Sequence, residues 1–259
     1  MARLILFLLL LGLVWNAAAQ TKSEVVQYKQ GDARLQGYLA HDTSLKGRRP
    51  GVLVVHDWFG LSDYAKMRAD QLAGLGYVAF AADVYGEGKQ LSNNQDASAE
   101  AGKFYKDRQL FRARVRAGLD YLASLPDVDP SKLAVIGYCF GGSGALELAR
   151  SGAPIKGVVS FHGGLSTPTP GDAKNIKAKV LVLHGADDPF VKQEDVKAFM
   201  DEMRGGGVDY QIVQYSDAVH GFTKKESGTD KSKGMAYNEA ADRRSWRAMQ
   251  DFFDEIFAK

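Results

Sequence analysis

The chain has 259 residues, of which 45% are hydrophobic and 25% are charged. Its 33 lysine and arginine residues nearly balance 31 aspartate and glutamate residues, so the formal net charge is only +2. This balance argues against binding to nucleic acid or to an anionic membrane surface, and a small molecule is the expected partner. The single cysteine excludes an internal disulfide, so core packing must stabilise the fold.

Residues 1–19 have the composition of a secretory signal peptide. Arg3 supplies a weak positive charge, an apolar run follows it, and three consecutive alanines ending at Ala19 form a small-residue cleavage site. The apolar run is shorter than the roughly twenty residues that a membrane-spanning helix needs. We therefore expect cleavage after Ala19, a periplasmic or secreted protein without a membrane span, and a single domain over residues 20–259.

Short apolar runs then alternate with helical patterns, which predicts an α/β fold with a mostly parallel sheet flanked by helices. The eight expected strands are Glu24–Tyr28, Leu35–Leu39, Gly51–His56, Tyr77–Ala82, Lys132–Ile136, Ile155–His162, Val180–His184 and Tyr210–Tyr215. The expected helices are Ser62–Leu72, Phe111–Ser124, Gly142–Arg150, Gln193–Met203 and Asn238–Phe257. Two polar stretches, residues 86–96 and 224–234, are expected to be surface loops near the carboxyl edge of the sheet.

A Gly-x-Cys-x-Gly turn follows the fifth expected strand, with Cys139 at its centre. An isolated cysteine is more often a small buried hydrophobe. Glycines two positions before and two positions after it, however, are typical of a nucleophile elbow, in which a strand turns sharply into a helix. A thiolate there would lie over a helix N-terminus, where backbone N–H groups favour negative charge. We therefore interpret Cys139 as a catalytic nucleophile.

An acid and a histidine follow Cys139 in the chain order that α/β-hydrolases use. Asp187 and Asp188 come directly after the expected strand Val180–His184, and His220 follows the strand Tyr210–Tyr215. Catalytic groups of open α/β sheets gather at the carboxyl ends of strands. We prefer Asp188 because it directly precedes Pro-Phe-Val, and Asp187 remains the alternative. His220 is the expected base.

The turn after the strand Gly51–His56 is expected to contribute to an oxyanion hole. In this fold class the loop after that strand donates one N–H group and the residue after the nucleophile donates another. These residues are Trp58 and Phe140, whose rings could equally wall an acyl pocket or serve packing alone.

The other histidines are interpreted as structural, since His41 is expected at the surface and the rest close strands. A metal hydrolase built on His56, Asp57, His184 and Asp187 is disfavoured, because their spacing resembles no known ligand set.

Together these residues resemble the dienelactone hydrolase family of α/β-hydrolases. The resemblance rests on Gly-Tyr-Cys-Phe-Gly-Gly, on the His56-Asp57-Trp58-Phe59-Gly60 turn, on Ala82-Asp83-Val84-Tyr85-Gly86 and on His220-Gly221-Phe222, and it covers nearly the whole chain beyond the signal. It implies a Cys139, Asp188 and His220 triad, no metal or organic cofactor, and opening of an ester or lactone through a thioester intermediate. It also makes Tyr105, Lys224 and Phe222 candidate substrate-binding residues.

The chain departs from the family pattern at two places. The family has a glutamate beside the thiol, where this chain has the shorter Asp57. If Asp57 reaches Cys139 it could hold the thiol neutral, and if it does not, a Cys139–His220 ion pair is expected. The family also holds the substrate carboxylate with two arginines, at positions that read Lys224 and Ala101 here. Arg108 or Arg112 could reach in from the same segment as Ala101, but dienelactone itself is a doubtful substrate.

The sequence therefore predicts an exported hydrolase of a small ester, lactone or thioester, similar to carboxymethylenebutenolidase. The alternative is a non-hydrolytic ligand-binding or thiol-sensing protein of the same fold. Only the cysteine in place of serine supports that alternative, and no second, resolving cysteine accompanies it. The sequence leaves the oligomeric state and the substrate open.

Overall fold

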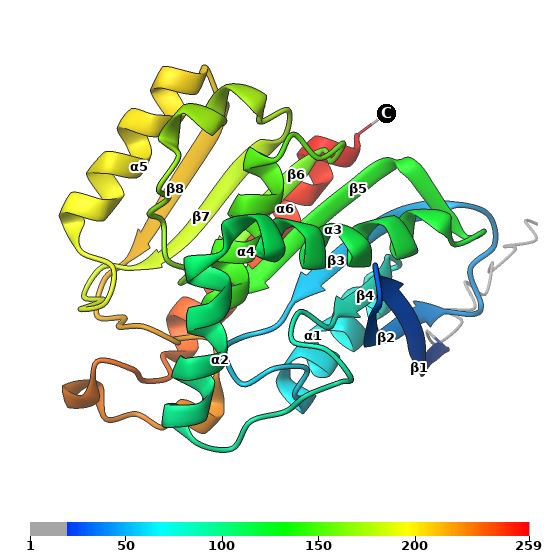
Figure 1. The fold of residues 1–259 in the computed structure, drawn as a ribbon, viewed down its shortest axis with the longest axis horizontal. Helices are drawn as coiled ribbons and strands as arrows, with labels where there is room; N and C mark the ends of the chain where they lie inside the picture. The colour runs from blue at the N-terminus through cyan, green and yellow to red at the C-terminus, as the bar shows by residue number, and fades with distance from the viewer. Residues whose placement is uncertain (1–19, 259) are drawn as a thin grey trace, which may run out of the picture.

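The structure is a computed structural model that describes residues 20–258, so the predicted signal peptide lies outside the described residues. Its centre is one eight-stranded sheet in the order β1-β2-β4-β3-β5-β6-β7-β8 (Figure 1). The strands are β1 Thr21–Gln30, β2 Ala33–Asp42, β3 Arg49–Val55, β4 Val78–Ala82, β5 Val128–Tyr138, β6 Gly157–Phe161, β7 Lys179–Gly185 and β8 Tyr210–Tyr215. The β1–β2 and β2–β4 pairs are antiparallel and the remaining pairs are parallel. This confirms the predicted α/β-hydrolase sheet.

The described residues form six α-helices: α1 Asp63–Gly74, α2 Asn94–Lys106, α3 Arg108–Ser124, α4 Phe140–Arg150, α5 Gln193–Gly206 and α6 Glu239–Phe257. Helices α3, α4 and α5 lie on one face, and α1 and α6 lie on the other (Figure 1). Short 3-10 helices occupy Pro170–Asn175, Lys225–Ser227 and Lys231–Lys233, so the polar stretch 224–234 is more ordered than a plain loop.

Helix α2 was not expected, and the predicted loop 86–96 is wrong at its end, where this helix has already begun. The side chain of Asn93 caps α2 by accepting a hydrogen bond from the Asp96 N–H at 2.9 Å. Its buried residues Ala97, Ala101 and Phe104 have helical spacing, but two of them are alanines, which give a weak hydrophobic signal. Ala101 faces the core, and thus cannot stand in for a substrate anchor.

The central strands bury both faces, as their continuous apolar sequences predict. Along β3, Leu53 and Val55 join the core under α3 and α4, while Val52 and Val54 join the core under α1 and α6. The apolar stripe of α6 packs into that second core through Met249, Phe252 and Phe253, with Trp246 and Ile256 at its margin. The sheet is thereby fixed from both sides, and its carboxyl edge becomes a rigid platform.

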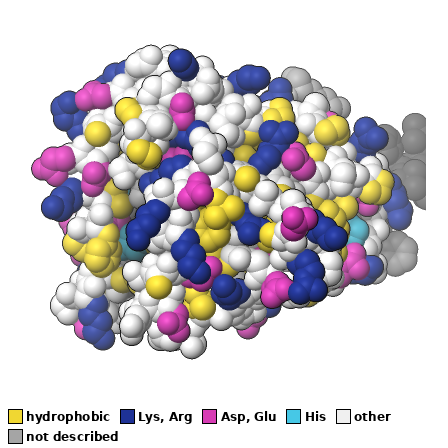
Figure 2. Space-filling view, in the orientation of Figure 1, with side chains coloured by type: hydrophobic (Ala, Val, Ile, Leu, Met, Phe, Trp, Pro, Cys, Tyr) yellow, Lys and Arg dark blue, Asp and Glu magenta, His cyan; other side chains and the backbone are white. Residues whose placement is uncertain are grey.

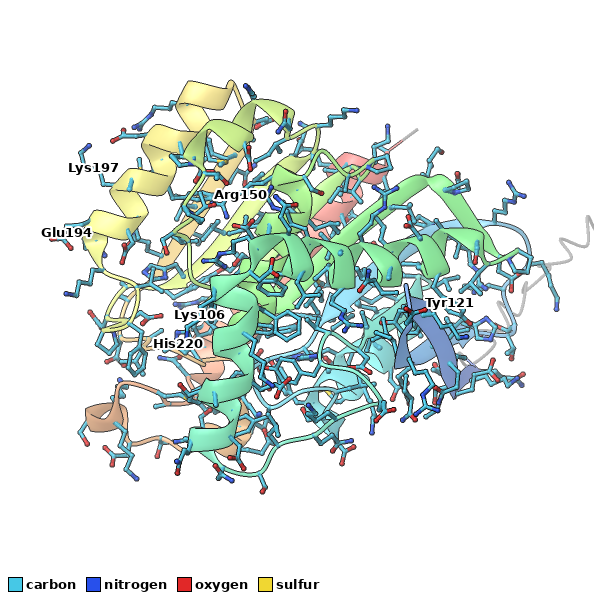
Figure 3. All side chains as sticks on the ribbon, viewed as in Figure 1. Lys106, Tyr121, Arg150, Glu194, Lys197 and His220 are labelled. Carbon is cyan, nitrogen blue, oxygen red and sulfur yellow. The ribbon has the colours of Figure 1, made fainter. Side chains whose placement is uncertain are left out.

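A buried ion-pair network joins the three helices of the first face. Glu147 on α4 is fully buried and binds Arg112 Nε at 2.8 Å and Arg150 Nη1 at 3.1 Å. Arg150, which lies among these helices in Figure 3, also holds Glu202 of α5 at 2.8 Å. The charges satisfy one another where water cannot reach them, so each depends on its partners.

The outer surface mixes both signs of charge. Figure 2 shows lysine and arginine side chains interspersed with aspartate and glutamate, without a large area of one sign on the visible face. None of the helices in the described part of the chain is both long and apolar enough to cross a membrane.

The buried network gives a stability prediction. Glu147→Ala leaves the Arg112 and Arg150 guanidinium groups without their carboxylate, so the free energy of unfolding should fall by about 3 kcal/mol in urea titrations. Lys197→Ala is the matched control, because it removes the exposed Lys197–Asp201 pair, and it should change stability by only about 0.5 kcal/mol. Equal effects of the two substitutions would contradict a stabilising role for the network.

Candidate active site

Cys139 lies at the sharp turn between β5 and α4. Its backbone has φ 55° and ψ −116°, a region that side-chain-bearing residues rarely adopt. Its N–H donates to the Phe161 carbonyl of β6 at 3.0 Å, which holds the turn against the neighbouring strand. The strained backbone directs the thiol away from the sheet, as expected for a nucleophile elbow.

Close backbone contacts explain the two glycines that flank this turn. A Cβ on Gly137 would lie 2.0 Å from the Gly141 carbonyl oxygen, and a Cβ on Gly141 would lie 2.2 Å from the Val55 carbonyl oxygen of β3. Neither backbone atom can move without displacing a central strand or the start of α4. Only glycine fits at either position.

The loops after β7 and β8 bring Asp188 and His220 to the thiol. His220 Nε2 lies 3.1 Å from Cys139 Sγ, and His220 Nδ1 lies 2.8 Å from Asp188 Oδ2. The other carboxylate oxygen of Asp188 accepts the N–H groups of Phe190 at 2.8 Å and Val191 at 3.2 Å. Asp188 is buried whereas its neighbour Asp187 is exposed, so the geometry favours Asp188 over Asp187.

The electrostatics of His220 favour its charged form. Burial alone would lower the pKa of His220, but the adjacent Cys139 sulfur and the hydrogen-bonded Asp188 carboxylate outweigh burial and raise the pKa to about 10. An imidazolium at His220 beside a thiolate at Cys139 is consistent with this direction. The arrangement can supply a nucleophile and a proton donor from one hydrogen-bonded pair.

Of the two expected oxyanion donors, Trp58 lines the same cavity as Cys139, and Phe140 follows Cys139 in the chain. Among residues 20–258, no hydrogen-bond acceptor engages the N–H groups of Trp58 and Phe140. The Trp58 carbonyl accepts the Tyr85 hydroxyl at 2.9 Å, which fixes the turn that carries the Trp58 N–H. The Phe140 ring is fully buried and stacks on Phe111 with centroids 4.5 Å apart, so this ring packs the core. The Trp58 ring instead lines the cavity beside the thiol.

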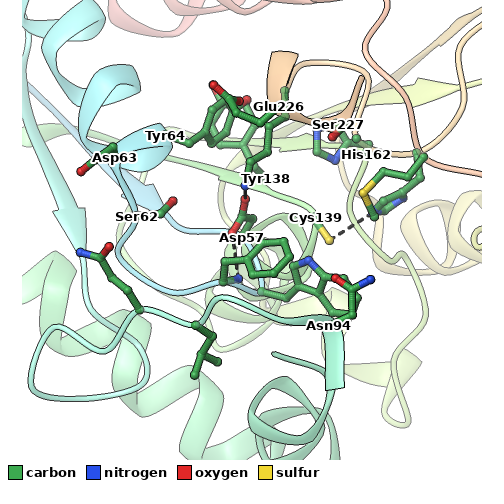
Figure 4. Close-up of a pocket in the computed structure, with 18 residues that line it drawn as sticks. Asp57, Ser62, Asp63, Tyr64, Asn94, Tyr138, Cys139, His162, Glu226 and Ser227 are labelled. Atoms are coloured by element: carbon green, nitrogen blue, oxygen red, sulfur yellow. Dashed lines mark hydrogen bonds and ion pairs between the residues drawn. The ribbon is translucent and has the colours of Figure 1, made fainter. Parts of the chain in front are cut away.

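That cavity has a volume of about 620 Å³, and both Cys139 and His220 line it. Figure 4 shows Cys139 at this cavity. Its wall combines the aromatic residues Trp58, Phe59, Tyr64 and Tyr138 with polar and charged side chains. A cavity of this size accommodates a small organic molecule.

Comparison with known proteins agrees with this geometry. Residues 35–257 match the sequence profile of the dienelactone hydrolase family. The chain belongs to the dienelactone hydrolase family. A solved dienelactone hydrolase-like promiscuous phosphotriesterase from metagenomic libraries is 44% identical, with a TM-score of 0.87, over 92% of this chain and 99% of that one.

Curated relatives align over most of their length as well. Protein usf of Aquifex pyrophilus is 29% identical over 90% of this chain and 98% of its own length. A putative carboxymethylenebutenolidase of Aquifex aeolicus is 28% identical over 78% of this chain and 88% of its own length.

Asp57 and Lys224 stand where the dienelactone hydrolase family has its acid beside the thiol and one of its two carboxylate-binding arginines. Asp57 and Lys224 both line the cavity, but they bind each other: Lys224 Nζ lies 2.7 Å from Asp57 Oδ2. The second oxygen of Asp57 accepts the Phe59 N–H at 2.9 Å. No hydrogen bond joins Asp57 to Cys139 among the described residues, and the sulfur contacts His220 instead.

The remaining candidates lie outside the cavity wall. Phe222 is fully buried and packs against His162 and Tyr215. The Tyr105 ring packs edge-on against Phe140, and its hydroxyl lies 3.5 Å from Ser143 Oγ.

The two arginines of the same segment do not line the cavity either. Arg108 stacks on Tyr105, and Arg112 is bound to Glu147 and Asp172. Neither arginine offers a guanidinium to a substrate in the cavity.

His162 is a site residue that sequence reasoning missed by treating it as structural. Its ring lies edge-on to His220 with centroids 5.2 Å apart, and its Nε2 lies 2.8 Å from Thr223 Oγ1. Burial, assisted by the charge of His220, lowers the pKa of His162 well below its usual range. The position of His162 in the sequence could have indicated this, because His162 directly follows a buried strand, and catalytic groups gather at the carboxyl ends of such strands.

The Cys139–His220 contact predicts a reactive thiol. At neutral pH, His220→Ala removes the imidazolium that stabilises the thiolate, so alkylation of the single cysteine by iodoacetamide should slow by about tenfold or more. Mass spectrometry of the intact protein measures this rate without interference from other thiols. An unchanged rate in His220→Ala would show that His220 does not activate the sulfur.

Proposed function

We propose that this protein is a cysteine hydrolase that opens a small ester, lactone or thioester through a thioester acyl-enzyme intermediate. The observation that carries the proposal is the hydrogen-bonded chain Cys139–His220–Asp188, placed at a strained elbow and facing a cavity. Membership of the dienelactone hydrolase family supports hydrolysis as the reaction class. The relatives named putative carboxymethylenebutenolidase support a carboxylic ester or lactone as the substrate class.

In the proposed mechanism the Cys139 thiolate attacks the substrate carbonyl and forms the carbon–sulfur bond. The Trp58 and Phe140 N–H groups stabilise the oxyanion of the tetrahedral intermediate, each contributing about 3 kcal/mol. His220 then protonates the leaving oxygen, and the carbon–oxygen bond breaks to give the thioester. His220 next takes a proton from water, whose oxygen attacks the thioester, and the carboxylic acid leaves as the thiolate and imidazolium re-form. Asp188 holds the histidine ring in the tautomer that these transfers require.

A phosphotriester is a second candidate substrate. The solved relative at 44% identity is named a promiscuous phosphotriesterase. The same two N–H groups could receive the phosphoryl oxygen of an uncharged triester, and the aromatic residues of the cavity wall suit its organic groups.

The first test of this proposal replaces the nucleophile. On a panel of p-nitrophenyl esters, small lactones and one uncharged phosphotriester, Cys139→Ala should lower kcat/KM by at least about a thousandfold, because no other group can form the acyl-enzyme. Cys139→Ser should retain a small fraction of the activity. Turnover that survives in Cys139→Ala would exclude Cys139 as the nucleophile, and no wild-type turnover on the panel would favour a ligand-binding or thiol-sensing protein instead.

A second test separates the two neighbouring aspartates. Asp188→Asn should lower kcat by about a hundredfold or more, since the amide no longer enforces the productive histidine tautomer. Asp187→Asn is the matched control at the adjacent, exposed position, and it should retain wild-type kinetics. Activity lost in Asp187→Asn and kept in Asp188→Asn would reverse the assignment of the acid.

A further inference from the structure

The ammonium group of Lys224 is already bound on several sides. It lies 2.7 Å from Asp57 Oδ2, 4.8 Å from the centre of the Phe59 ring and 5.5 Å from that of Tyr64. The Lys224 side chain is 19% exposed and that of Asp57 is 6% exposed, so water screens the pair weakly. A carboxylate and two aromatic faces therefore satisfy this cation before any substrate arrives.

The charges around the cavity oppose an anionic ligand. Lys224 is the one lysine or arginine among the described residues of the cavity wall, whereas Asp57, Asp63 and Glu226 all contribute carboxylates. Figure 4 shows Asp57, Asp63 and Glu226 around the same space. With Lys224 paired to Asp57, and His220 paired to Asp188 and Cys139, no unpaired positive charge remains on the described cavity wall to attract a substrate carboxylate.

A substrate carboxylate that displaced Asp57 from Lys224 would also disturb the turn after β3 that carries Trp58. Asp57 would be left as a nearly buried carboxylate without its cation, a state that is costly in a weakly solvated site. The same carboxylate accepts the Phe59 N–H at 2.9 Å, next to Trp58, whose N–H is the proposed oxyanion donor. The Asp57–Lys224 pair thus ties the turn after β3 to the loop that carries His220.

We propose that Asp57 determines substrate specificity by neutralising Lys224, so that the site accepts esters and lactones whose acyl group is uncharged and rejects those that carry a carboxylate. This inference rests on the proposed hydrolase function and refines its substrate class. In this proposal Asp57 pairs with Lys224 and thereby sets substrate specificity. It does not control the protonation of the Cys139 thiol.

The test compares two esters of similar length, p-nitrophenyl hexanoate and mono-p-nitrophenyl adipate, the second of which carries a terminal carboxylate. The measured quantity is the ratio of kcat/KM for the adipate to that for the hexanoate, at low salt and after subtraction of spontaneous hydrolysis. Wild type should prefer the hexanoate. Asp57→Asn frees the ammonium of Lys224 while its amide oxygen can still accept the Phe59 N–H, so the ratio should rise by about tenfold.

Three further variants test whether the change in the kcat/KM ratio depends on the Asp57–Lys224 charge pair. Asp57→Glu keeps the negative charge and should retain the low ratio. Lys224→Met leaves Asp57 unpaired and should lower the ratio below the wild-type value. The double variant Asp57→Asn with Lys224→Met has neither charge, and its ratio should return to within about threefold of wild type if the two effects act through each other.

The outcomes separate this proposal from the hydrolase function itself. An Asp57→Asn ratio unchanged from wild type, or a gain that persists in the double variant, would overturn the specificity proposal while Cys139-dependent hydrolysis of the hexanoate still stood. If Asp57→Asn fails to fold, Lys224→Met decides, because an unchanged or increased ratio there contradicts the proposal. Raised salt should diminish the Asp57→Asn gain, since salt screens the attraction between Lys224 and the carboxylate of the incoming adipate ester.

Discussion

The turn at Cys139 is the constraint on which the rest of the site depends. Positive φ at a cysteine is unfavourable, and it persists here because β5, β6 and α4 fix the backbone on both sides. The close approach of Gly141 to Val55 of β3 sets how near the start of α4 can lie to the sheet. That distance fixes the positions of the Cys139 sulfur and the Phe140 N–H, the two groups that the proposed mechanism places around the substrate carbonyl.

The groups around the thiol come from separate strand ends that a parallel sheet brings to one edge. Trp58 follows β3, His162 follows β6, Asp188 follows β7 and His220 follows β8. The buried ion pairs of Glu147 and Arg150 hold the helices over this sheet, so the loops start from fixed positions. Small changes in those loops can alter the substrate while the nucleophile stays in place.

Local sequence signals predicted much of this arrangement. The elbow could be recognised because its glycines stand within two residues of Cys139, and the central strands could be placed because buried strands have continuous apolar sequences. Helix α2 was missed because its core face is mainly alanine. The order of Asp188 and His220 along the chain was informative only because the fold class fixes which loops meet.

Contacts between distant segments could not be predicted in the same way. Asp57 and Lys224 are 167 residues apart in the chain. The sequence around either residue alone predicts an unpaired charged side chain near a binding site. Only the folded structure shows that they cancel each other, and that His162 lies beside His220. The proposed substrate preference therefore depends on pairing in space, whereas the proposed nucleophile could be assigned from local sequence.

The most direct test of the account is to detect the acyl-enzyme. The protein would be mixed with p-nitrophenyl acetate, quenched in acid within the first turnover, and its mass and peptide map recorded. The account predicts a single acetyl group on Cys139, removable by hydroxylamine and absent from Cys139→Ala. Rapid turnover with no adduct, or an acetyl group on a residue other than Cys139, would contradict catalysis through the thiol.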